Sequence, residues 1–106
     1  MTKQDVVRIL RCDGSKHFGI LKLALINVAI NGDEILNIGA YDFYFEYWNG
    51  ELSIIAMYDC VYQTIFSEII SDSDIDWELK QVSENLYNRV EKTLIDFLFL
   101  RVGAVK

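Results

Sequence analysis

Apolar and polar residues alternate along residues 42–59, DFYFEYWNGELSIIAMYD, on both sides of an Asn-Gly pair. Alternation with a period of two predicts β-strands, and Asn-Gly is the preferred pair for a two-residue type I′ turn. The stretch therefore predicts a β-hairpin, with strands at about 41–48 and 51–59. With this turn, Trp48 lies opposite Glu51, and Tyr47 lies opposite Leu52.

The two faces of the predicted hairpin differ in chemistry. The face expected to join the core is apolar and carries Tyr41, Phe43, Phe45, Tyr47, Leu52, Ile54, Ala56 and Tyr58. The other face mixes carboxylates with large side chains and carries Asp42, Tyr44, Glu46, Trp48, Glu51, Ser53, Ile55 and Met57. A hairpin alone is marginally stable in water, so its apolar face needs a cover. Residues 34–38 are predicted to add a short third strand.

Elsewhere, apolar residues recur at intervals of three and four, which predicts about four helices. The first helix follows Thr2, a suitable N-cap, and ends near Gly14; the second follows Ser15 and ends near Gly32. A strand is the alternative for both segments, because β-branched residues are frequent in VVRILR and LALINVAI.

Two further helices are predicted in the second half of the chain. The third, at about 62–70, is based on the spacing of Tyr62, Ile65, Phe66, Ile69 and Ile70. The fourth, at about 76–102, carries an apolar stripe formed by Leu79, Val82, Leu86, Val90, Leu94 and Phe97. The order of elements predicts an α+β fold in which the helices pack on one face of a small antiparallel sheet.

Composition agrees with one folded domain spanning residues 1–106, since 52% of the residues are hydrophobic and no spacer-like segment divides the chain. Lys22 and Asn27 interrupt the apolar stretch at 18–30, which is shorter than the roughly 20 residues of a membrane span. The start of the chain does not resemble a signal peptide. We therefore expect a cytoplasmic protein that makes no membrane contact and keeps Cys12 and Cys60 as buried free thiols.

Charge is strongly segregated along the chain. Residues 33–78 contain eleven Asp and Glu residues and no Lys, Arg or His, whereas the two flanking segments together are net positive. The formal net charge of −6 is therefore the sum of −11 in this segment and +5 in the rest. Gathered charge of one sign can steer an oppositely charged partner toward the molecule.

The acidic segment also holds the aromatic hairpin, and together they predict a partner-binding site. Tyr44 and Trp48 are the expected anchors, because Tyr and Trp are enriched at protein interfaces. Carboxylates would supply charge complementarity; they are Asp42, Glu46, Glu51, Asp72, Asp74 and Asp76. The alternatives are that the acids only solubilise the protein, cap a helix or pair with arginines, and that another element covers the aromatic face.

The candidate catalytic and cofactor-binding motifs in the sequence are incomplete, so they do not support an enzyme. His17 and Cys12 lack a third orienting group, and together with Cys60 they lack the paired spacing of a zinc site. The acidic run that starts at Asp72 resembles a calcium loop, but Trp77 stands where that loop needs Gly. Phosphate-binding glycine motifs are absent from the sequence, and the few Lys and Arg residues are split between the two ends. We therefore predict no catalysis, no cofactor, no metal and no direct binding of nucleic acid.

These features favour a small acidic cytoplasmic protein that neutralises a basic protein partner by occlusion. Such partners include nuclease toxins and other nucleic-acid enzymes, for which this chain would be an immunity protein or a phage-type inhibitor. The alternative is a homo-oligomeric structural or accessory subunit without catalytic activity. Its basis is the apolar end of the last helix, residues 94–102, together with the similarly apolar second helix, and burial of these surfaces would form a homodimer.

Overall fold

The computed structural model describes residue 4 and residues 20–71, 73–76 and 81–104. Two helices and six strands follow one another in these residues: α2 (Ile20–Asn31), β1 (Asp33–Ile38), β2 (Tyr41–Trp48), β3 (Glu51–Tyr58), β4 (Val61–Ile69), β5 (Ile75–Asp76), β6 (Gln81–Val82) and α3 (Glu84–Ala104). The first four strands form an antiparallel meander in the order β1-β2-β3-β4, and β5 pairs with β6 in a separate small sheet.

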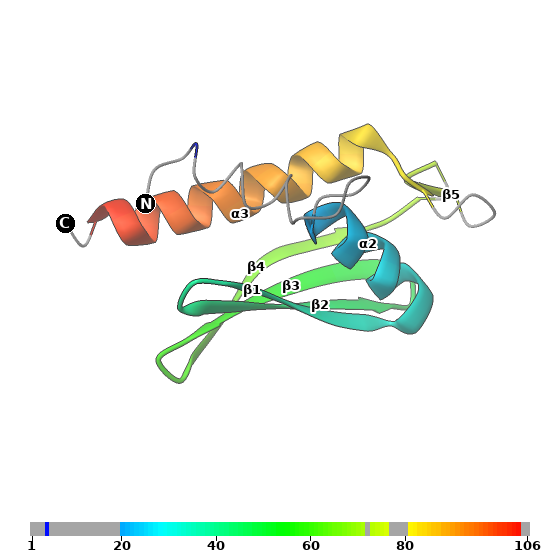
Figure 1. Ribbon diagram of the computed structural model, residues 1–106. Helices are drawn as coiled ribbons and strands as arrows, with labels where there is room; N and C mark the ends of the chain where they lie inside the picture. Colours follow the sequence, from blue (N-terminus) through cyan, green and yellow to red (C-terminus); the bar gives the residue numbers. More distant parts are fainter. Residues whose placement is uncertain (1–3, 5–19, 72, 77–80, 105–106) are drawn as a thin grey trace.

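The helices form one layer and the four-stranded sheet forms the other. Figure 1 shows α2 and α3 on the same side of the sheet, with no described element on the opposite side. The core lies between the layers, where α2 contributes Leu21 and Leu25, and α3 contributes Leu86 and Leu94, all at most 2% exposed. The sheet is therefore covered on one face, as predicted for an α+β fold.

The structure confirms the β2–β3 hairpin and its register. Trp48 pairs with Glu51 and Tyr47 with Leu52. Asn49 and Gly50 have φ angles of 54° and 81°, which are the positive values that a type I′ turn requires. Phe43 and Phe45 are fully buried under the helices, so the predicted apolar face is the core face. The predicted third strand is also present as β1.

The prediction of about four helices is wrong. The described residues form two helices, and the segment expected to be the third helix is strand β4, which pairs along its length with β3. A β-bulge explains the error: Ile54 pairs with Phe66 and Ile55 pairs with Thr64, so Ile65 is an extra residue in β4. One inserted residue breaks the alternation of a strand and produces apolar spacings of three and four, which resemble a helix.

The remaining helix predictions have mixed outcomes. Residues 23–30, LALINVAI, lie within α2, so the strand alternative for this segment is wrong. The last helix begins at Glu84, later than predicted, because β5 and β6 occupy part of the expected first turns. Ser83 is its N-cap, since the Leu86 amide donates a hydrogen bond to the Ser83 hydroxyl over 3.0 Å. The first predicted helix lies almost entirely outside the described residues.

Candidate functional site

The face of the sheet that points away from the helices is called the open face below. Residues directly opposite each other on neighbouring strands point to the same side, so the register defines its members. They are Asp33, Ile35 and Asn37 on β1; Asp42, Tyr44, Glu46 and Trp48 on β2; Glu51, Ser53, Ile55 and Met57 on β3; and Tyr62, Thr64, Ser67 and Ile69 on β4. None of these side chains is buried, whereas the alternate residues of β2 and β3 face the core.

Large apolar and aromatic side chains cross the open face from strand to strand. Ile35 lies opposite Tyr44, and Tyr44 lies opposite Ile55, which forms a row over three adjacent strands. At the end of the face that lies next to the β2–β3 turn, Trp48 is 78% exposed and Ile69 is 73% exposed. Contiguous exposed apolar surface of this kind marks interaction sites in soluble proteins.

Acidic side chains surround this row. Asp33 and Glu46 lie directly opposite one another on β1 and β2. Repulsion between like charges in such a pair normally destabilises a sheet. Desolvation of the Tyr44 phenol raises its pKa, and the nearby carboxylates of Asp33 and Glu46 raise it further. Tyr44 therefore stays protonated beside two carboxylates on this face.

The other two carboxylates of the open face have only neutral partners among the hydrogen bonds of the described residues. The Asn37 amide donates to Asp42 Oδ1 over 2.7 Å, and the Ser53 hydroxyl donates to Glu51 Oε1 over 3.4 Å. The four-stranded sheet contains no Lys, Arg or His. Among the side chains described, the basic residues Lys22, Arg89 and Lys92 all belong to the helices. Within the described residues, the four-stranded sheet therefore carries acidic charges alone, whereas the helix layer carries both signs.

The eight predicted site residues do not form one cluster. Five of them, Asp42, Tyr44, Glu46, Trp48 and Glu51, share the open face. Asp76 lies exposed on β5 in the small second sheet, and Asp72 lies outside the described residues.

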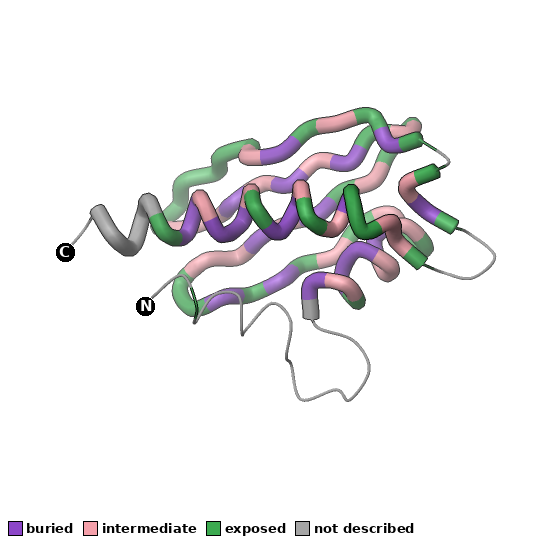
Figure 2. The backbone as a smooth tube through the Cα atoms, turned by 90° about the horizontal axis from the view of Figure 1, so that it is seen from above, coloured by how far each residue is buried: buried purple, intermediate pink, exposed green. Residues whose placement is uncertain are grey.

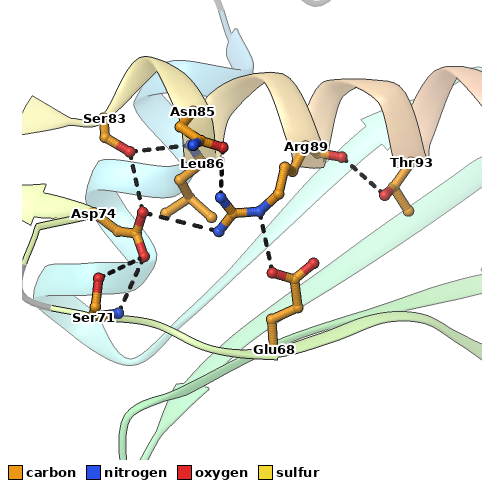
Figure 3. Close-up of polar contacts among 8 residues, drawn as sticks. All are labelled: Glu68, Ser71, Asp74, Ser83, Asn85, Leu86, Arg89 and Thr93. Atoms are coloured by element: carbon orange, nitrogen blue, oxygen red, sulfur yellow. Dashed lines mark hydrogen bonds and ion pairs between the residues drawn. The ribbon is translucent and has the colours of Figure 1, made fainter.

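Asp74 belongs to a polar network between β4 and α3, shown in Figure 3. Its Oδ2 accepts hydrogen bonds from the Ser71 amide and the Ser71 hydroxyl, each over 3.1 Å. Its Oδ1 accepts from the Ser83 hydroxyl over 3.3 Å and lies 3.9 Å from the Arg89 guanidinium. Partial burial alone would raise the pKa of Asp74, but the hydrogen bonds from Ser71, the charge of Arg89 and the bond from Ser83 together lower it.

Arg89 links this network to the sheet. Its Nε donates to Glu68 Oε1 on β4 over 3.1 Å, and its other nitrogens reach Asp74 and Asn85. The carboxylates of the acidic segment therefore differ in role. Glu68 and Asp74 hold α3 to the sheet through Arg89, which agrees with the alternative that some of these acids pair with arginines.

Three exposed residues of the open face, Ile35, Tyr62 and Ile69, were not among the predicted site residues. Tyr62 and Ile69 were assigned to the inner stripe of a helix, yet in β4 they are 74% and 73% exposed. The signal that identifies them is strand pairing, because Tyr62 lies opposite Met57 and Ile69 lies opposite Glu51. Ile35 is recognisable in the same way, from its position opposite Tyr44.

Comparison with protein-family models, curated proteins and solved structures finds no match to this chain. Within the described ranges, no group of three or more His, Cys, Asp or Glu side chains is arranged to hold a metal ion. Neither α2 nor α3, the two helices of the described part, is both long enough and apolar enough to cross a membrane. The open face is therefore the strongest candidate site in the described structure.

Proposed function

We propose that this protein binds a basic protein partner through the open face and neutralises it by occlusion. The observation that carries the proposal is the joint position of Asp33, Asp42, Glu46 and Glu51 around exposed aromatic and apolar side chains, on a sheet without any basic residue. Complementary charge accelerates encounter with a basic surface, and burial of the aromatic side chains then stabilises the complex.

The partner class follows from the chemistry of this face. A surface with carboxylates spaced along neighbouring strands is complementary to a groove lined by Lys and Arg, which is the surface that nucleic-acid enzymes use to bind phosphates. A nuclease toxin or another nucleic-acid enzyme is therefore the proposed target. The protein would act in the cytoplasm as an immunity protein or a phage-type inhibitor, without chemistry of its own.

The alternative, a homo-oligomeric accessory subunit that dimerises through the last helix, now has less support. Leu94, Ile95, Phe97 and Leu98 are at most 9% exposed within a single chain. Their apolar character is explained by the core, so these residues do not require a second copy. Among the side chains described at this helix end, Phe99 is a large apolar one that stays accessible, with 51% of its surface exposed.

The test begins with capture of the partner by the tagged protein and its identification by mass spectrometry. Binding of the purified partner is then measured by calorimetry at low and high salt for the wild type and for Glu46→Gln/Trp48→Ala/Glu51→Gln. We expect the triple variant to bind at least tenfold more weakly and to depend less on salt, because it lacks two charges and one anchor. The partner's own activity should be lost in a stoichiometric complex with the wild type.

A matched control removes charges from the helix layer. Glu84→Gln/Asp96→Asn neutralises two acids of α3 and leaves the open face unchanged. Equal weakening by the control and the triple variant would contradict a specific role of the open face. A partner that binds but keeps its activity would contradict occlusion.

A further inference from the structure

The two edges of the main sheet differ in how well they are protected. β1 and β4 are the edge strands, so each has one side without a neighbouring strand in the described structure. Edge strands expose unpaired backbone amides and carbonyls, and proteins protect them with charges, proline, short length or a covering element. β1 has six residues and begins with Asp33 and Glu34. β4 has nine residues, none of them Lys, Arg or Pro.

The least protected part of β4 is its first half, residues 61–64, with the sequence VYQT. All four residues are exposed, and they form the continuous exposed run near the end of the edge strand in Figure 2. The helix layer does not cover this end, which projects with the β3–β4 turn away from the helices in Figure 1. The segment is uncharged and rich in residues that favour strands.

We propose that residues 61–64 pair with the same segment of a second copy of this chain, which joins two four-stranded sheets into one eight-stranded sheet. A second copy fits this edge better than the basic partner does, because the carboxylates of the open face lie on β1, β2 and β3. The single charge of β4 is Glu68, which is already paired with Arg89 over 3.1 Å. Pairing of the edge with itself therefore brings no unpaired like charges together.

The bulge and the two faces restrict the register of this pairing. A twofold axis perpendicular to the sheet makes the strands antiparallel and keeps both open faces on the same side. Directly opposite residues must then come from the same face. The register centred on Gln63 meets this condition, and it sets Gln63 opposite Gln63 of the second copy and Tyr62 opposite Thr64. Regular pairing ends at Ile65, the extra residue of the bulge. The open faces of both copies become one surface.

Sedimentation velocity across a concentration series tests the proposal on the full chain. So small an interface predicts a reversible dimer with a dissociation constant of about 10–500 μM. Gln63→Lys places two lysines opposite each other on the axis, and we expect it to raise the dissociation constant at least tenfold. Asn37→Lys, the same charge change on the β1 edge, should leave dimerisation unchanged.

A second measurement covers the case in which Gln63→Lys perturbs folding, which circular dichroism would reveal. In a Cys12→Ser/Cys60→Ser background, Gln63→Cys should form an intermolecular disulfide under mild oxidation, whereas Asn37→Cys should not. A wild type that stays monomeric up to about 0.5 mM would overturn the proposal. So would a dimer that Asn37→Lys disrupts and Gln63→Lys does not. Neither result decides whether the open face binds a basic partner, because that binding is measured in a separate experiment.

Discussion

Two of the three hairpins of the main sheet, β2–β3 and β3–β4, have positive φ angles at both turn residues but differ in the residues that adopt them. In the β2–β3 turn, Asn49 and Gly50 have φ angles of 54° and 81°; in the β3–β4 turn, Asp59 and Cys60 have φ angles of 45° and 63°. Asn-Gly favours positive φ at both positions, whereas a residue such as Cys is rarely found there. The turn residues of the β2–β3 hairpin therefore favour that hairpin by themselves, whereas the β3–β4 hairpin, called the second hairpin below, depends on the structure around it.

The surroundings of β4 show what supports the second hairpin. Beyond the bulge, Phe66 and the following Ile70 are buried in the core. Glu68 is bound by Arg89 of α3, and Ser71 donates to Asp74, which also binds the N-cap Ser83. Support is thus concentrated at the far end of β4, and its turn end is exposed. Tertiary contacts can stabilise a strand in a segment whose local sequence does not favour one.

The largest expected difference between these two hairpins is the loss of stability when an aromatic side chain is replaced by alanine. Phe45→Ala removes a fully buried ring of β2 and should lower the free energy of unfolding by about 3–5 kcal/mol. Tyr62→Ala removes a ring of β4 that is 74% exposed and should change stability by less than about 0.5 kcal/mol in the monomer. Urea denaturation at low protein concentration measures both. Similar losses for the two variants would mean that Tyr62 is buried against something absent from the described structure.

The same contrast explains how much of the fold could be predicted from the sequence. The β2–β3 hairpin was predicted with its register because strict alternation and Asn49-Gly50 are both local signals. β4 was missed because Asp59-Cys60 is not a recognised turn pair and because the extra residue, Ile65, changes the apolar spacing. The position of the bulge depends on pairing with β3, which the sequence of β4 alone does not specify.

The candidate site was predictable to the extent that its residues share one strand pair. Alternation alone put Tyr44, Glu46 and Trp48 on one face, and the structure places them there. Asp74 could not be distinguished from these acids by sequence, since its role depends on Arg89 and Ser83 from a distant helix. The contribution of Asp33 required the pairing of β1 with β2, which sets it opposite Glu46.

The Asp74 network can be weakened without touching either turn. Asp74→Asn removes the charge that faces Arg89 and weakens the bonds from Ser71 and Ser83, so it should lower the free energy of unfolding by about 2 kcal/mol at pH 7. Asp96→Asn is the control: it breaks the exposed pair with Lys92 on α3, which should contribute less than about 0.5 kcal/mol. Equal losses would show that Asp74 is no more important than a surface ion pair.

The pH dependence provides an independent readout of the same network. The pKa of Asp74 is lower in the folded state than its ordinary value of 3.8, so the stabilisation is fully present above that value. It is lost as the pH falls through the lowered folded-state pKa. The difference between the wild type and Asp74→Asn should therefore be constant from pH 7 to about pH 5 and shrink at more acidic pH. A difference that stays constant to the most acidic pH at which the protein folds would contradict this account.

The smallest expected effects come from exchanging the turn residues, and they test the comparison most directly. Gly50→Ala places a side chain at φ 81° with no atom within 4 Å of the new Cβ, so any loss reflects the backbone; we expect about 1 kcal/mol. Cys60→Gly relieves a positive φ of 63° at an exposed residue and should raise stability by about 0.5 kcal/mol, because greater freedom of the unfolded chain offsets part of the gain. Opposite signs in thermal denaturation would show that one turn favours its hairpin and the other is held in place by the rest of the fold. A destabilising Cys60→Gly would mean instead that the Cys60 side chain makes a contact worth more than the backbone strain it brings.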